Sequence, residues 1–161
     1  YHRGEVFAMV GARRVHGQLV SNLLRSLGTA LEGSPCRVFS ESMKLQIADD
    51  TILYPDVFVT CDRDDLATEM IFRAPTIVIE VLSPSTQGYD RSQKFALYRR
   101  IGSLREYVLI DPDTRRVESF RRNDQAQWVL HDMSGEQTLA LPAIHVQVPM
   151  AALFEGLEPS S

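Results

Sequence analysis

Several features that would place this chain of 161 residues in a special class are missing. No apolar run approaches the roughly 18 residues of a membrane-spanning helix, so no membrane partner is expected. There is no secretory signal peptide, although the chain starts at Tyr1 rather than Met, and we therefore expect an incomplete N-terminus. Internal repeats, linkers and low-complexity segments are also absent. The length then favours one domain over residues 1–161.

Cysteine is scarce, and its pattern excludes a metal site of the zinc-finger type. Cys36 and Cys61 are the only two cysteines, and their spacing is not that of metal ligands. Disulfides are rare in the cytoplasm. We therefore expect two reduced, structural thiols in a cytoplasmic protein.

Basic residues are missing from the last quarter of the chain. Residues 123–161 carry five acidic groups and no Lys or Arg, and the whole chain has a net charge of −4. Residues 75–122, in contrast, carry nine basic and six acidic groups. This local excess fits an anionic ligand, but a solvated helix and hairpin face would show the same composition.

The apolar residues that are present alternate between helical and strand spacing. Residues 15–31 have the apolar period of an amphipathic helix. Pro55 should interrupt a strand over residues 52–60 or place it at a sheet edge. A short helical turn should follow Pro149. Strands are predicted over residues 5–10, 37–39, 43–47, 52–60, 76–82, 105–110, 116–121, 127–131 and 144–148.

One charged residue stands inside the most apolar of these strands. Residues 76–82 are a nearly continuous Ile and Val run, which is typical of a strand buried on both faces, and Glu80 lies within it. A buried charge is costly unless it is paired, protonated or bound to a metal. The role of Glu80 is therefore the central question for the chain.

A short helix follows this strand and carries a lysine on its apolar side. Asp90 is a good N-cap, and the helix should run to about Ile101. Lys94, Leu97, Tyr98 and Ile101 recur at helical spacing, so Lys94 should face inward. Tyr98 is expected in the core.

Asp56, Glu80 and Lys94 together fit one kind of chemistry. Two carboxylates on neighbouring strands can hold Mg²⁺, and the backbone carbonyl of Val81 could be a third ligand. A lysine beside the metal can orient the attacking water. This set predicts metal-dependent phosphodiester hydrolysis, although Glu80 and Lys94 could equally form a structural ion pair.

Four motifs resemble a known family, and together they extend over much of the chain. They are Tyr54-Pro-Asp56-Val, Ile79-Glu80-Val-Leu-Ser-Pro-Ser85, the helix that carries Tyr89-Asp90, Lys94 and Tyr98, and Arg105-Glu-Tyr-Val-Leu-Ile-Asp111-Pro. The sequence thereby resembles the Uma2 family, also called the DUF820 domain. The resemblance implies a restriction-endonuclease-like fold of the PD-(D/E)xK type. The fold class is then α/β (α+β), with a mixed central sheet flanked by helices and additional antiparallel hairpins.

The resemblance also implies roles for individual residues. Asp56 and Glu80 would be the metal-binding carboxylates. The lysine usual at the second position after the glutamate is replaced by Leu82, so Lys94 would supply it from the following helix. Glu5 and His16 would lie near the same site and could assist. From its position alone, His16 is more typical of a surface or capping residue.

The leading hypothesis is therefore an endonuclease that uses Mg²⁺ or Mn²⁺ and acts on DNA, most simply as a homodimer that cuts both strands. Asp90 is a possible accessory residue in addition to its capping role. The alternative is a non-catalytic nucleic-acid-binding or regulatory module with the same fold, which the overall acidity favours. A two-carboxylate glycosidase fits least, because the chain lacks an aromatic-rich sugar cleft.

Overall fold

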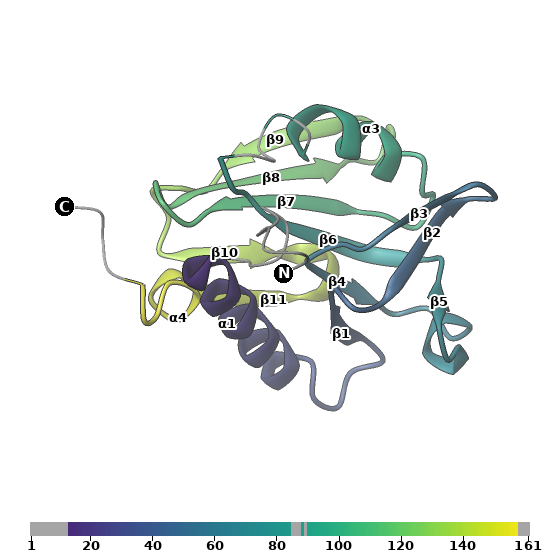
Figure 1. Cartoon of the computed structure of the whole chain (residues 1–161), viewed down its shortest axis with the longest axis horizontal. Coiled ribbons are helices and arrows are strands. Elements are labelled where there is room, and N and C mark those ends of the chain that lie inside the picture. The colour runs from purple at the N-terminus through teal and green to yellow at the C-terminus, as the bar shows by residue number, and fades with distance from the viewer. Residues whose placement is uncertain (1–12, 85–87, 89, 158–161) are drawn as a thin grey trace, which may run out of the picture.

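A six-stranded mixed sheet forms the centre of the molecule (Figure 1). The structure is a computed structural model, which describes residues 13–84, 88 and 90–157. β6 and β7 are parallel, and the other neighbours in this sheet are antiparallel. The strands, in spatial order, are β1 (Arg37–Ser40), β4 (Val57–Thr60), β6 (Pro75–Val81), β7 (Glu106–Asp111), β8 (Arg116–Arg122) and β9 (Trp128–Asp132).

Two smaller sheets lie beside the central one. β3 (Thr51–Leu53), β2 (Lys44–Ala48) and β5 (Ile71–Phe72) form one, in that spatial order, and β10 (Thr138–Leu141) pairs with β11 (Val146–Pro149) in the other. The predicted strand 52–60 is therefore divided at Tyr54-Pro55. Its first part joins the small sheet and its second part joins the central sheet, as expected from a proline that cannot donate a ladder hydrogen bond.

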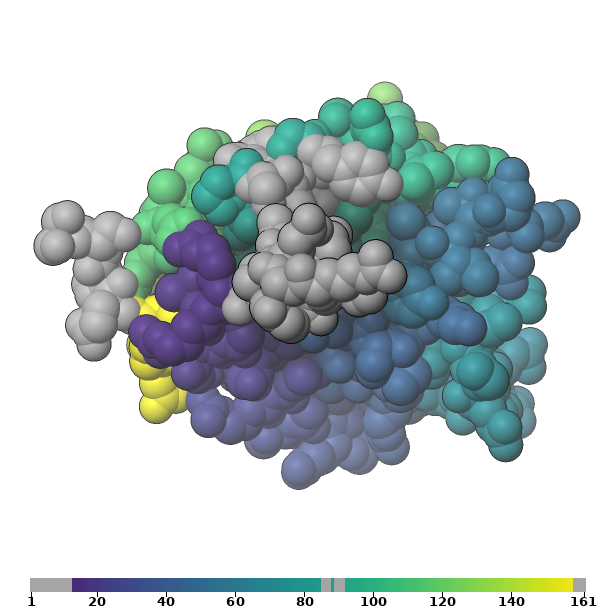
Figure 2. All heavy atoms as spheres, in the orientation of Figure 1, coloured from purple at the N-terminus to yellow at the C-terminus, as the bar shows by residue number. Residues whose placement is uncertain are grey.

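The longest described helix, α1 (Arg14–Ala30), packs on one face of the central sheet. α1 confirms the helix predicted over residues 15–31. It packs near α4 (Met150–Leu153), whereas β2, β3 and β5 occupy the opposite end of the molecule (Figures 1 and 2). The short 3₁₀ segments η1 (Asp65–Ala67) and η3 (Pro142–Ile144) connect strands. None of the described helices is long and apolar enough to cross a membrane.

The helix after β6 differs from its prediction. The structure has a π-helical segment, η2 (Asp90–Lys94), followed by α3 (Phe95–Tyr98). Gly88 is also helical, so Asp90 lies inside the helical segment and is not its N-cap. The helix ends at Tyr98, before Ile101, where the chain continues through turns. A π-helical segment has i→i+5 hydrogen bonds, a pattern that an expectation based on the α-helical period does not include.

Side chains of the central sheet alternate between two cores. On one face, Ile77, Ile79 and Val81 of β6 pack in the cluster that contains the apolar stripe of α1 and the β10–β11 hairpin. On the other face, Val78 and Leu82 pack with α3 and the small sheet. Since successive residues of a strand point to opposite faces, Glu80 belongs to the α3 face.

The two cysteines correct one expectation. Cys36 and Cys61 form a disulfide, so the prediction of two reduced thiols is wrong. The cause is the register of β1 and β4, in which Arg37 faces Thr60, so the next pair outward is Cys36 with Cys61. Their separation of 25 residues hides this proximity in the sequence. The cysteines therefore give no support to a cytoplasmic location.

Candidate active site

Asp56 and Glu80 meet at one end of the central sheet. Asp56 directly precedes β4, and Glu80 is the penultimate residue of β6. Val57 faces Ile79 in the antiparallel register, so the next pair outward is Asp56 with Glu80. The Val81 N–H donates a 2.8 Å hydrogen bond to Asp56 Oδ2, which fixes the Asp56 carboxylate against the end of β6.

Glu80 is buried, with 1% of its side chain exposed, and it is held by two residues of the following helix. Lys94 Nζ lies 3.4 Å from Glu80 Oε2. Tyr98 donates a 3.0 Å hydrogen bond to Glu80 Oε1. Lys94 therefore faces inward as its spacing predicts, and Tyr98 lies in the core as predicted.

The hydroxyl of Tyr98 is a permanent donor at this site. Burial raises the pKa of Tyr98 far above its usual value, and the charge and hydrogen bond of Glu80 raise it further. The phenol therefore stays protonated at neutral pH, and its O–H donates to the glutamate. The sequence predicted Tyr98 in the core, with stacking on a base as the alternative, and did not predict its hydrogen bond to Glu80. Its position four residues after Lys94, on the same helix face, is the signal that could have revealed the contact.

His16 of α1 contacts one of these two carboxylates, Asp56. It lies in the first turn of α1, and its Nε2 is 3.2 Å from Asp56 Oδ1. Both side chains are mostly buried, with 18% and 16% exposed. The resemblance placed His16 near the site, and in the structure His16 lies beside Asp56; its assisting role stays a prediction. The alternative of a surface histidine does not hold.

Asp56 is ionised despite its burial. Burial alone would raise its pKa, but hydrogen bonding and charge from His16, the Val81 N–H and a hydrogen bond with Glu80 together lower the pKa below its ordinary value. Asp56 is thus a carboxylate in a protected position. Such a group is available as a ligand for a cation.

Glu41 is a further acidic residue of the site that the sequence did not indicate. It follows β1 in a turn and is exposed. Its carboxylate, His16 and Asp56 offer ligand atoms that all lie within 4.8 Å of one another. No local pattern marks Glu41, because only the packing of α1 against β1 and β4 brings the three elements together.

Three other predicted features have different outcomes. Glu5 and the strand over residues 5–10 lie outside the described residues, as does the side chain of Asp90. Leu82 is buried in the second core, which agrees with its apolar character. Val81 contributes its N–H to Asp56, and a role for its carbonyl stays a prediction.

The donor set fits a divalent cation. Asp56 and Glu80 present two carboxylates at adjacent positions, where their mutual repulsion must be balanced. Lys94 and His16 are the basic groups that the described residues place beside them. Oxygen ligands of this kind suit Mg²⁺ and Mn²⁺.

Comparisons with known proteins identify the family of this chain. The model of the Uma2 family, described as "Putative restriction endonuclease", matches residues 1–151. The chain belongs to the Uma2 family. Two uncharacterized proteins of the cyanobacterium Synechocystis are relatives. The protein slr1290 is 30% identical over 98% of this chain and 83% of its own length, and sll1609 is 36% identical over 83% and 77%.

A solved structure confirms the predicted fold of this Uma2 chain. The crystal structure of a "putative nuclease belonging to DUF820" from Anabaena variabilis superposes with a TM-score of 0.76. It covers 98% of this chain and 90% of its own chain at 20% identity. The mixed sheet with its flanking helices is therefore the fold of a restriction-endonuclease-like family.

Proposed function

We propose that this Uma2 protein is a metal-dependent endonuclease that hydrolyses phosphodiester bonds of DNA. The observation that carries the proposal is the meeting of Asp56 and Glu80 at the end of β6, with Lys94 Nζ 3.4 Å from Glu80. Membership of the Uma2 family supports a nucleic-acid substrate. The whole chain would act as one nuclease domain.

Each residue then has a distinct task. Asp56 and Glu80 would hold Mg²⁺ or Mn²⁺, and the Val81 carbonyl would add a ligand. The cation, when bound, supplies charge stabilisation to the scissile phosphate and makes a water molecule more nucleophilic. Lys94 donates hydrogen bonds that orient this water, and Tyr98 keeps the Glu80 carboxylate in one orientation by its hydrogen bond.

The position of these groups suits a long polymeric substrate. The site lies where β6 ends and β4 begins, at an end of the sheet, and the side chains of Asp56 and Lys94 are 16% and 20% exposed there. His16 arrives from the α1 face, while Lys94 arrives from the α3 face. A backbone phosphate would reach the site from this partly exposed end, and Asp90 and Glu5 stay candidate accessory residues.

A homodimer would let the enzyme cut both strands of a duplex. β9 is one edge of the central sheet, and its Val129 and Leu130 are 42% and 48% exposed. An exposed strand edge is a natural surface for pairing with a second copy. Light scattering after gel filtration, compared between wild type and Leu130→Lys, tests this assignment: a monomeric wild type would refute it. The cytoplasmic location stays a prediction.

The decisive experiment is cleavage of supercoiled plasmid and of a labelled duplex oligonucleotide. Wild type, Glu80→Gln and Lys94→Met are compared in Mg²⁺, in Mn²⁺ and in excess EDTA. We expect nicking by wild type with metal, and its loss in EDTA and in both variants. Equal residual cleavage in wild type and Glu80→Gln would exclude this site. Binding of DNA without cleavage in any metal would favour the non-catalytic module.

A further inference from the structure

We infer that His16, Glu41 and Asp56 form a binding site for a first-row transition-metal dication, which this site takes in preference to Mg²⁺. The site adjoins the Asp56–Glu80 pair and shares Asp56 with it. The inference rests on the proposed function only in treating Asp56 as a metal ligand. It does not require that DNA be cut.

The three ligands come from three elements that converge at the same place. His16 is in the first turn of α1, Glu41 follows β1, and Asp56 precedes β4. Their donor atoms all lie within 4.8 Å of one another. Ligands around one small cation, at about 2.0–2.2 Å each, lie at most about 4.4 Å apart, so a shift of a few tenths of an ångström completes the site.

Burial within the set favours a built site over a chance meeting of surface charges. His16 and Asp56 are mostly buried and already 3.2 Å apart. Their geometry is therefore fixed before a cation arrives. Glu41 is exposed, and its carboxylate can close over an ion that the other two hold. A pair fixed in advance and one adaptable ligand reduce the ordering cost of binding.

The two oxygens of Asp56 allow the residue to serve both sites. Oδ2 accepts the Val81 N–H on the β6 side, whereas Oδ1 is directed to His16. A cation on the Oδ1 side would therefore sit between α1 and the turn that carries Glu41. A cation held with Glu80 would sit on the other side of the same carboxylate.

The imidazole decides which ions this site prefers. Mg²⁺ takes oxygen ligands and keeps most of its waters. Imidazole nitrogen suits transition metals, and for a mixed nitrogen and oxygen set the affinity rises from Mn²⁺ toward Co²⁺ and Zn²⁺. One nitrogen with two carboxylates should therefore select Mn²⁺ or Co²⁺ over Mg²⁺.

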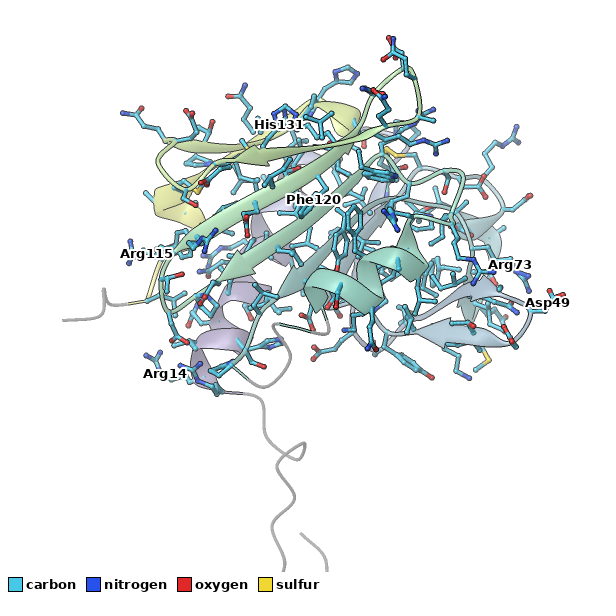
Figure 3. The ribbon with its side chains drawn as sticks, turned by 90° about the horizontal axis from the view of Figure 1, so that it is seen from above. Arg14, Asp49, Arg73, Arg115, Phe120 and His131 are labelled. Atoms are coloured by element: carbon cyan, nitrogen blue, oxygen red, sulfur yellow. A yellow bond between two sulfur atoms is a disulfide. The ribbon has the colours of Figure 1, made fainter. Side chains whose placement is uncertain are left out.

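The test uses Mn²⁺ as the probe and the full chain without a polyhistidine tag. Pulsed electron paramagnetic resonance reports a ¹⁴N modulation when an imidazole is bound to Mn²⁺. We expect this modulation in wild type and in His131→Gln, and its loss in His16→Gln. Figure 3 places His131 on β9, well apart from Arg14 at the start of α1, so it is a matched control.

Calorimetry measures the selectivity in parallel. His16→Gln should lower the ratio of Mn²⁺ to Mg²⁺ affinity by at least about tenfold. Glu41→Gln should weaken Mn²⁺ binding, whereas Glu32→Gln, an exposed glutamate with the same change of charge, should not. Saturation with Mn²⁺ without ¹⁴N modulation, modulation that persists in His16→Gln, or no Mn²⁺ binding would each overturn the inference.

These outcomes separate the inference from the nuclease proposal. A ¹⁴N signal from His16 in a protein that cuts no DNA would support the metal site and refute the nuclease. Cleavage that depends on Glu80, in a protein whose bound Mn²⁺ shows no nitrogen ligand, would do the reverse.

Discussion

Two buried glutamates on neighbouring strands have different partners in the same fold. Glu80 of β6 and Glu106 of β7 are 1% and 2% exposed. In the parallel register Ile77 faces Glu106 and Glu80 faces Leu109, so the two glutamates are offset by three residues, about 10 Å. They also point to opposite faces, because their strand neighbours pack in different cores.

Glu106 is neutralised locally. Arg121 is its direct cross-strand partner in β8, with Nε 3.3 Å from Glu106 Oε1, and the Ala143 N–H donates to Oε2 at 3.0 Å. Among the residues that the structure describes, no second carboxylate takes part in these contacts. Burial nevertheless raises the pKa of Glu106, opposed by Ala143 and Arg121. This arrangement is an ion pair that joins β7 to β8 and η3.

The surroundings of Glu80 are different. Its neighbour in the register is another carboxylate, Asp56, and its basic partner comes from a helix and not from the adjacent strand. A structural ion pair needs only one basic partner and a backbone donor, as Glu106 has in Arg121 and the Ala143 N–H. Beside Glu80 lies a second carboxylate, Asp56, which His16 and the Val81 N–H contact, and a bound cation would balance the charge of the two carboxylates. The comparison therefore favours a site at Glu80 and a structural role for Glu106.

The largest expected effect is on cleavage. Glu80→Gln should lower the rate of plasmid nicking by about 10²–10³-fold, because it removes a charge on which the cation depends. Glu106→Gln, the same change on the next strand, should leave the rate close to that of wild type. Loss of nicking in both variants would mean that Glu80 and Glu106 do not differ in their importance for cleavage.

A second expectation concerns the basic partners. Arg121→Met should lower the free energy of unfolding by about 3–5 kcal/mol, because it leaves Glu106 buried without its cation. Lys94→Met should cost about 1–3 kcal/mol, since Glu80 keeps the hydrogen bond from the Tyr98 hydroxyl. Urea unfolding measures both. A larger loss for Lys94→Met would indicate that this pair is mainly structural.

Stabilisation by Mg²⁺ should also depend on Glu80 and not on Glu106. If Mg²⁺ binds at Asp56 and Glu80, a concentration of 100 times its dissociation constant stabilises wild type by about 2.7 kcal/mol. Thermal unfolding with and without Mg²⁺ should show this gain in wild type and in Glu106→Gln. The gain should disappear in Glu80→Gln. A gain of the same size in all three proteins would place the cation elsewhere.

The smallest effect is on the pH dependence of stability, and its sign differs between Asp56 and Glu106. The pKa of Asp56 is lowered in the folded state, so its stabilisation is present above the ordinary value of 3.8 and is lost as the pH falls through the lowered pKa. The pKa of Glu106 is raised, so a penalty develops as the pH rises from 4.5 through the raised pKa.

Urea unfolding at several pH values, compared with Asp56→Asn and Glu106→Gln, measures these two contributions. Relative to Asp56→Asn, the wild type should lose stability as the pH falls. Relative to Glu106→Gln, it should lose stability as the pH rises toward neutral. Slopes of the same sign would contradict the assignment of the two environments.

The amino-acid sequence by itself determined the elements whose signal is local. The apolar period of residues 15–31 specifies α1, and the Ile and Val run specifies β6, because both patterns reflect burial of a single segment. Asp56, Glu80 and the inward position of Lys94 could also be predicted, from an anomalous charge, a helix phase and the family motifs.

Only the tertiary structure decided the contacts that depend on register between distant strands. The β1–β4 pairing joins Cys36 to Cys61, and the packing of α1 on the sheet brings Glu41 to His16. The sheet also decided that Glu106, which looks like an ordinary strand residue, is a buried partner of Arg121. Such contacts arise from the joint arrangement of several segments, and no single segment carries a pattern that reports them.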